Sequence, residues 1–307
     1  MSNTILLYRK FIKSGRGEPW FLLLLLSLIW GSSFILIKEG LIAFTPEQAT
    51  ALRVSIAFVF MLPFVFKNFK KLPKEKRKYI IVIGIVGNLL PSLFFSLAET
   101  ELESSITGML NGLTPLFALL IAVYIFKYKI EFYQIVGIII GFAGTIILSL
   151  VNTTGSFGGV NIYALLVVTA TLCYAISLNL IAVHLSETGA VTVSALALAT
   201  IGPVSMIYLF STDFISVFMT NPDALRSFGA MVILGILGTA VGIVLYTRLI
   251  QTTSVFFAGI VTYMIPIVAV FWGLIYGEKI FALHFAGLLL ILTGVYYVNK
   301  SEDKIIK

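Results

Sequence analysis

The chain has 307 residues, of which 59% are hydrophobic and only 11% are charged, and its mean hydropathy is +1.04. This composition excludes an ordinary soluble globular protein and predicts a chain that crosses a lipid bilayer many times. The net charge of +7 indicates no nucleic-acid partner, because the cations gather between apolar stretches, as membrane orientation requires.

Residues 1–19 are basic and precede the first apolar stretch. This arrangement resembles a signal peptide, but the apolar part is flanked by Trp20 and Lys38 and lacks a small-x-small cleavage pattern. We therefore expect a retained first span. Length and hydropathy predict an all-α membrane protein with ten spans. The expected spans are 20–37, 47–66, 79–98, 104–126, 132–151, 162–183, 190–210, 227–247, 254–276 and 280–298.

Cations are distributed unevenly between the two sides of this arrangement. Seventeen Lys and Arg residues fall on the side of the N-terminus, seven of them between residues 67 and 78, and three fall on the other side. The positive-inside rule then places both termini, 1–19 and 299–307, in the cytoplasm and the protein in the cytoplasmic membrane.

The sequence repeats itself. Residues 104–126 recur 151 positions later at 255–277, and the glycines of GIVG at 84–87 recur in GILG at 235–238. The halves are therefore 20–151 and 162–298, joined by an external linker at 152–161. Because each half has five spans, the two lie in opposite orientations, which is the inverted repeat of alternating-access transporters.

Each copy of the repeated stretch has a proline near its middle, Pro115 and Pro266, and Pro91 adds a bend in span three. A proline inside a helix deprives the carbonyl four residues earlier of its partner. Those carbonyls belong to Asn111 and Thr262. We expect two kinked helices that face a polar cavity, because an unpaired carbonyl in lipid is unfavourable.

Several motifs follow one another along the two halves in a characteristic order and spacing. They include IWGSS at 29–33, Ala-Leu-Arg at 51–53, the GIVG and GILG pair, the span-four proline seven residues after a glycine, and Tyr-Gly-Glu at 276–278. Over residues 20–298 the sequence resembles the EamA-type branch of the drug/metabolite transporter superfamily. The resemblance implies ten helices in two inverted five-helix repeats that move small organic metabolites. The first half has Lys127-Tyr128-Lys129 where Gly-Glu would stand, so no role passes to Glu278 by symmetry.

Polar and aromatic residues in the opening and kinked spans are the candidates for a substrate-binding cavity. Rings, amides and hydroxyls together suit a neutral or zwitterionic solute, although each residue has an alternative role in bonding a neighbouring helix. The candidates are Trp30, Ser33, Asn88, Ser92, Asn111, Thr114, Tyr174, Ser177, Asn179, Thr239, Tyr246, Thr262 and Tyr263.

Arg53 is the one arginine well inside a predicted span, and its repeat partner is Ala197. An ionisable residue at this depth is a candidate for a gate or a substrate contact, and the alternative is an anchor paired with a nearby glutamate. Glu99 lies in the external turn directly after span three, where it is either part of a polar cap or a proton-titrating or gating carboxylate.

The glycines at 137, 141 and 144 form a small-residue face on span five. This face favours packing within the chain over a dimer seam, so a monomer is expected. The single cysteine, Cys173, and two distant histidines form no metal-ligand cluster, so no metal or cofactor is expected.

These features predict a transporter with a small-molecule substrate in the lipid bilayer, most simply an exporter of amino acids or similar metabolites. An uptake carrier for a vitamin, choline or a nucleoside is the alternative transporter. A membrane scaffold or lipid-handling protein is the alternative of another class. An enzyme is not expected, because no catalytic constellation lies at a membrane face.

Overall fold

The computed structural model describes residues 18–128, 130–151, 155–158, 161–253 and 255–299. The predicted terminal segments, except for residues 18, 19 and 299, and much of the predicted linker at 152–161 lie outside these ranges. Within them the regular structure is helical, apart from an isolated bridge between Val151 and Phe157. Nine described helical segments are long and apolar enough to cross a membrane, and Ala282–Val298 is a shorter apolar one. Together they are the ten predicted spans.

The helices of the first half belong to spans one to five. They are α2 (Glu18–Gly31), α3 (Ser33–Gly40), α4 (Pro46–Asn68), α5 (Arg77–Gly84), η3 (Ile85–Leu89), α6 (Leu90–Ala98), α7 (Ser104–Asn111), α8 (Thr114–Tyr124) and α9 (Phe132–Leu150). Two short 3₁₀ turns, η1 (Phe69–Lys71) and η2 (Lys74–Lys76), connect α4 to α5.

The second half also has five spans, and it contains the short helix α12, which the sequence did not predict. Its elements are α10 (Ile162–His184), α11 (Ala190–Ser211), α12 (Phe214–Thr220), α13 (Ala224–Ile233), η4 (Leu234–Val241), α14 (Gly242–Thr252), α15 (Val255–Gly259), α16 (Val261–Ile275) and α17 (Ala282–Asn299). Span eight is longer than expected, since it continues to Thr252.

Local sequence explains where α4 begins. The Thr45 hydroxyl accepts a hydrogen bond from the Gln48 backbone N–H, and the Gln48 side chain accepts one from the Thr45 N–H. This capping box satisfies two backbone donors that the first turn leaves unpaired, and Pro46 loses nothing there. The cap fixes the start of the span that carries Arg53.

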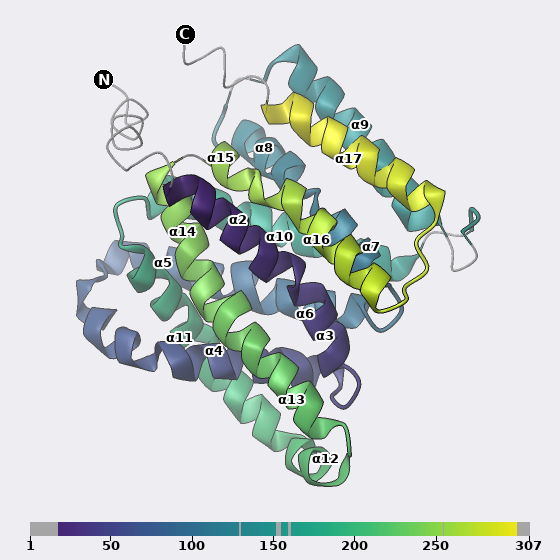
Figure 1. Ribbon diagram of the computed structural model, residues 1–307. Helices are drawn as coiled ribbons and strands as arrows, with labels where there is room; N and C mark the ends of the chain where they lie inside the picture. The colour runs from purple at the N-terminus through teal and green to yellow at the C-terminus, as the bar shows by residue number, and fades with distance from the viewer. Residues whose placement is uncertain (1–17, 129, 152–154, 159–160, 254, 300–307) are drawn as a thin grey trace.

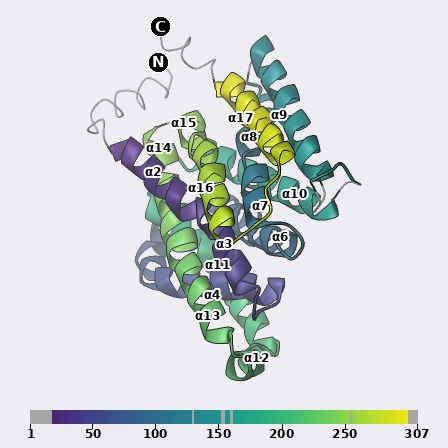
Figure 2. The same cartoon turned by 45° about the vertical axis from the view of Figure 1, so that its right-hand side comes forward.

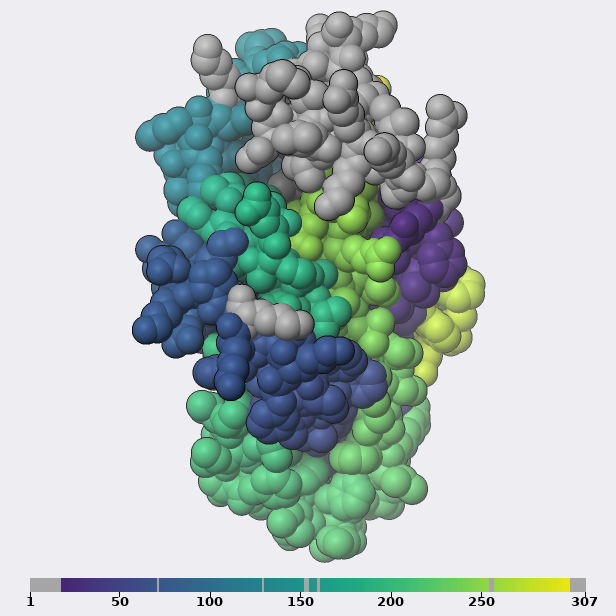
Figure 3. Space-filling view, turned by 90° about the vertical axis from the view of Figure 1, so that its left-hand side faces the viewer, coloured from purple at the N-terminus to yellow at the C-terminus, as the bar shows by residue number. Residues whose placement is uncertain are grey.

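The two halves interlock. The first-half helix α4 packs against α11 and η4 of the second half, and α2 packs against α16 and α14. Figure 3 shows one face of this arrangement, where the blue segments of the first half lie among the green segments of the second half. A site at the centre of the bundle therefore receives side chains from both halves.

The paired helices α9 and α17 lie along one side of the bundle (Figures 1 and 2). An added Cβ at Gly137 would lie 2.5 Å from the Gly294 carbonyl oxygen, and one at Gly144 would lie 2.5 Å from that of Gly287. The glycine face of span five thus permits close contact within the chain, as expected. In the repeat Gly137 matches Gly287 and Gly144 matches Gly294, so the two contacts are equivalent.

Candidate substrate cavity

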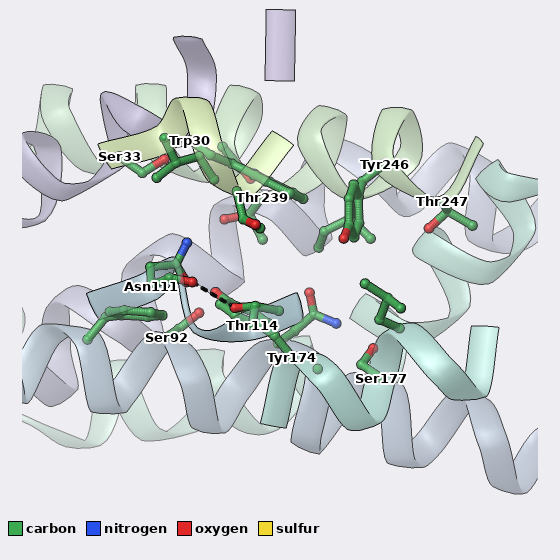
Figure 4. Close-up of a pocket in the computed structure, with 18 of the residues that line it drawn as sticks. Trp30, Ser33, Ser92, Asn111, Thr114, Tyr174, Ser177, Thr239, Tyr246 and Thr247 are labelled. Carbon is green, nitrogen blue, oxygen red and sulfur yellow. Dashed lines mark hydrogen bonds between the residues drawn. The ribbon is translucent and has the colours of Figure 1, made fainter. Parts of the chain in front are cut away.

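A cavity of about 100 Å³ lies at the centre of the bundle. Eleven of the thirteen predicted cavity residues line it, and so does Arg53. They are Trp30, Ser33, Asn88, Ser92, Asn111, Thr114, Tyr174, Ser177, Thr239, Tyr246 and Thr262. In Figure 4, Trp30, Thr239 and Tyr246 face Asn111, Thr114 and Tyr174 across the space between them.

Asn179 and Tyr263 are the two exceptions. The Asn179 amide nitrogen donates to the carbonyl oxygens of Ala118 at 3.1 Å and Ala175 at 2.9 Å, so this side chain joins two helices. Tyr263 follows Thr262 directly, and successive residues on a helix point about 100° apart. Thr262 lines the cavity, whereas Tyr263 does not.

Two π-helical segments shape the cavity walls, and the repeat places them at equivalent positions. In η3 the Asn88 amide nitrogen donates to the Ile83 carbonyl at 2.8 Å, and in η4 the Thr239 hydroxyl donates to the Leu234 carbonyl at 3.2 Å. Each bond spans five residues, and each side chain therefore stabilises the wide turn that carries it. The expected match of Asn88 with Thr239 thus has a local structural basis.

Close contacts of the glycines in these segments also follow the repeat. An added Cβ at Gly87 would lie 2.2 Å from the Ser177 hydroxyl oxygen, and one at Gly238 would lie 3.1 Å from that of Ser33. Ser33 and Ser177 are repeat partners. Small residues therefore bring the first span of each half against the π-helical segment of the other half.

The proline-containing spans differ from the expected matched kinks. Span four is interrupted between α7 and α8, just before Pro115, and the Thr114 hydroxyl donates to the Asn111 carbonyl at 2.9 Å. In the second half the interruption lies at Ile260, while α16 continues through Pro266. A proline in a helix is tolerated where neighbouring groups compensate for the lost bond.

The polar side chains at these positions also differ. The Thr262 hydroxyl donates to the Gly259 carbonyl at 2.7 Å, whereas the buried Oδ1 of Asn111 has no hydrogen-bond partner among the described residues. An unsatisfied buried acceptor that lines a cavity can accept a hydrogen bond from a bound solute. The Asn111 side chain is therefore more available than the Thr262 side chain for a hydrogen bond to a bound solute.

Two aromatic pairs extend the repeat. The ring centroids of Trp30 and Tyr246 are 4.8 Å apart, and those of Tyr174 and Phe95 are 5.8 Å apart. Trp30 matches Tyr174, and Phe95 matches Tyr246 at an offset of 151. Phe95 was not among the predicted cavity residues, although the offset of 151 matches it with Tyr246, which was.

Arg53 is 8% exposed and lines the cavity. Its Nε donates to the Thr239 hydroxyl oxygen at 2.6 Å, and the guanidinium also interacts with the Tyr174 phenol. Among the described residues, no carboxylate lies within ion-pair distance of Arg53. The predicted pairing of Arg53 with a glutamate is therefore not observed among these residues, and the buried guanidinium that lines the cavity is held by Thr239 and Tyr174 instead.

The end of the bundle near Gly40 is closed by ion pairs that sequence analysis did not predict. Lys38 Nζ lies 2.5 Å from a Glu103 oxygen and 3.5 Å from a Glu278 oxygen. We call Lys38, Glu103 and Glu278 the closing cluster. It ties the first span to the loops that precede α7 and α17.

Glu278 binds the N-terminus of α7. Its carboxylate accepts hydrogen bonds from the Ser104 N–H at 2.8 Å, the Ser104 hydroxyl at 2.7 Å and the Ser105 N–H at 3.0 Å. Burial raises the pKa of Glu278, but these bonds and Lys38 outweigh that effect and hold its pKa below the usual value. The repeat did not predict that Glu278 binds the N-terminus of α7, because the first half lacks the Gly-Glu pair.

Phe34 and Phe95 line the cavity, and their ring centroids are 5.6 Å apart. A second cavity shares Thr114 and Tyr246 with the first and reaches Ala122 and Tyr128, at the far end of α8. The internal space therefore continues toward the end of the bundle near Glu18 and is closed toward Gly40.

A ten-helix inverted repeat around a buried polar cavity defines a membrane transporter for small solutes. The EamA-like transporter family model matches residues 19–150 and again 161–300. The chain belongs to the EamA-like transporter family, and it is a multi-pass membrane protein.

Two similar proteins match nearly the whole chain. An "Uncharacterized transporter" of Archaeoglobus fulgidus is 27% identical over 93% of this chain and 100% of its own. The "Uncharacterized inner membrane transporter YedA" of Escherichia coli K12 is 26% identical over 90% and 89%. One solved crystal structure is 14% identical, with a TM-score of 0.64 over 95% of this chain and 99% of that one, and it supports the fold alone.

Proposed function

We propose that this protein moves small organic solutes bearing a carboxylate, and that it exports amino acids or similar metabolites across the cytoplasmic membrane by alternating access. The observation that carries the proposal is Arg53, a buried guanidinium that lines the cavity and has no carboxylate within ion-pair distance in the described part of the chain. A buried charge without a counter-ion is unfavourable, and a substrate carboxylate supplies one.

The remaining cavity groups suit a zwitterion. The unpartnered Oδ1 of Asn111 accepts a hydrogen bond from an ammonium group, and the rings of Trp30 and Tyr246 contact an apolar side chain. No carboxylate among the described residues lines the cavity, which disfavours a purely cationic substrate such as choline.

The inner-membrane location is supported by the name of the Escherichia coli relative and by the apolar spans. Alternating access is supported by the asymmetry of the internal space, which continues toward the Glu18 end and is closed at the Gly40 end. The predicted orientation places the Gly40 end outside, so this conformation would load substrate from the cytoplasm.

The test measures binding to detergent-purified protein by thermal shift, with each amino acid, its C-terminal amide and its decarboxylated amine as separate ligands. We expect shifts with at least one amino acid and none with the matched amide or amine. Arg53→Ala should abolish the shift, and Arg53→Lys should restore part of it if charge suffices without a bidentate contact. Arg248→Ala, which removes an exposed arginine paired with Glu18, is the control and should bind normally.

Two outcomes would count against the proposal. Equal shifts with the acid and its amide would remove the role of the carboxylate. Normal binding by Arg53→Ala would make Arg53 a structural residue that holds Thr239.

A further inference from the structure

Glu99 is a buried acid near the closing cluster. It directly follows α6, one turn beyond Phe95, and is 3% exposed. Neither of its carboxyl oxygens has a hydrogen-bond partner among the described residues. An ionised carboxylate in such a place is strongly unfavourable, whereas a protonated carboxyl is neutral.

The charges around Glu99 also disfavour its ionised form. Lys38 on α3, Arg53 on α4 and Glu278 in the loop before α17 act on it electrostatically. Lys38 is already shared between Glu103 and Glu278, so the closing cluster has two acids and one base. Arg53 interacts with Thr239 and Tyr174 instead of Glu99. The two cations that act on Glu99 are thus both bonded to other groups while the Gly40 end is closed.

Burial is the main cause that raises the pKa of Glu99 well above its usual value, and the charge of Glu278 raises it further. Lys38 and Arg53 lower the pKa, but by less. The position of the side chain and the direction of its pKa therefore agree.

We propose that Glu99 is a proton-binding site that couples the opening of the Gly40 end to proton release. In the closed state Glu99 holds a proton. When the closing cluster separates, the carboxyl O–H bond breaks and the proton passes to water in the groove lined by Lys38, Pro46 and Thr100. The ionised Glu99 then pairs with the released Lys38. Protonation from the same side reverses these steps and favours closure.

This inference rests on the proposed alternating-access function but not on the proposed carboxylate substrate. It makes opening of the Gly40 end pH-dependent even without a solute. Failure of the substrate test would leave it standing, and its own failure would leave the Arg53 site standing.

The test uses a reporter cysteine at position 37, since Ile37 is buried and lines the cavity just below Lys38. Cys173 is first replaced by serine, which removes the only native thiol. Intact cells are labelled from outside with a membrane-impermeant maleimide, so that in the predicted orientation the reagent reaches position 37 only through the Gly40 end. The pH outside is varied from about pH 5 to about pH 9, above the usual glutamate pKa of about 4.3. Because thiol reactivity itself rises with pH, each rate is divided by that of a cysteine at exposed Pro222.

We expect the normalised rate to rise with pH, by up to about ten-fold per pH unit below the pKa of Glu99. Glu99→Gln, which has the shape of the protonated acid, should give a rate that does not change with pH. Glu101→Gln, at an exposed neighbouring glutamate, is the matched control and should keep the rise. Two results would overturn the proposal. One is a normalised labelling rate that does not change with pH in the protein that keeps Glu99, and this result needs no variant at Glu99. The other is a rise of the rate with pH in Glu99→Gln equal to that in the protein with Glu99.

Discussion

Arg53 and Thr239 form a hydrogen bond of 2.6 Å between helices of opposite halves. The same Thr239 hydroxyl donates to the Leu234 carbonyl within η4. One hydroxyl therefore stabilises a π-helical turn and orients the guanidinium that faces the cavity.

Replacement of Thr239 tests this double role. Thr239→Ala should lower the thermal stability and weaken substrate binding, because loss of a buried hydrogen bond costs about 1–3 kcal/mol, or roughly five- to a hundred-fold in affinity. Thr239→Ser keeps the hydroxyl and should recover most of both losses. Thermal unfolding and ligand-induced shifts measure the two effects, and equal behaviour of the two variants would contradict the role of the hydroxyl.

Asn111 and Thr262 should respond differently to removal of their polar groups. Asn111→Ala removes an acceptor that bonds to none of the residues that the structure describes, so it should weaken binding by roughly five- to a hundred-fold with little loss of stability. Thr262→Ala removes a hydroxyl bonded to Gly259, so it should lower stability as well. Substrate-induced thermal shifts of the purified variants measure both effects. Unchanged shifts in both variants would remove these residues from the site.

The contact between α9 and α17 should tolerate no side chain at Gly144. Gly144→Leu should lower the thermal unfolding temperature strongly, because even a Cβ there would meet the Gly287 backbone. Gly229 is the control, since an added Cβ would meet nothing within 4 Å, and Gly229→Ala should be neutral or stabilising by up to about 1 kcal/mol. Similar unfolding temperatures for Gly144→Leu and the parent would refute this packing.

Glu278 should make the fold sensitive to acid. Its pKa is lowered in the folded protein, so its carboxylate stabilises the fold above the usual glutamate pKa of about 4.3. This contribution is lost as the pH falls through the lower folded-state pKa. The difference in unfolding temperature between the parent and Glu278→Gln should therefore be largest near neutral pH and shrink below about pH 4.3. A difference that stays constant with pH would exclude the carboxylate as its source.

The cation distribution predicts which end of the bundle faces the cytoplasm. With Cys173 replaced, a cysteine at exposed Thr100 should react with an impermeant reagent on intact cells, and one at exposed Pro73 should not. Both should react after the cells are opened. Reaction at position 73 in intact cells would reverse the orientation.

Much of the fold was predictable from the sequence because the bilayer restricts it. Spans such as 47–66 and 162–183 were found from length and hydropathy alone, since backbone polar groups in lipid must bond within a helix. The repeat offset then predicted that Ser33 matches Ser177 and that Gly84 and Gly87 match Gly235 and Gly238. These partners make equivalent contacts, because an inverted repeat applies the same packing twice.

Only the tertiary structure decided which groups satisfy one another across the halves. Arg53 reaches Thr239, and Glu278 reaches Ser104, over separations of 186 and 174 residues that no local pattern encodes. The π-helical turns and the interruption at Ile260 depend on how neighbouring helices and side chains satisfy backbone groups, so proline position alone did not locate them. Hydrophobicity and the repeat offset thus determined the spans and their symmetry. The placement of single charges and hydrogen bonds depended instead on close packing between segments that are distant in the sequence.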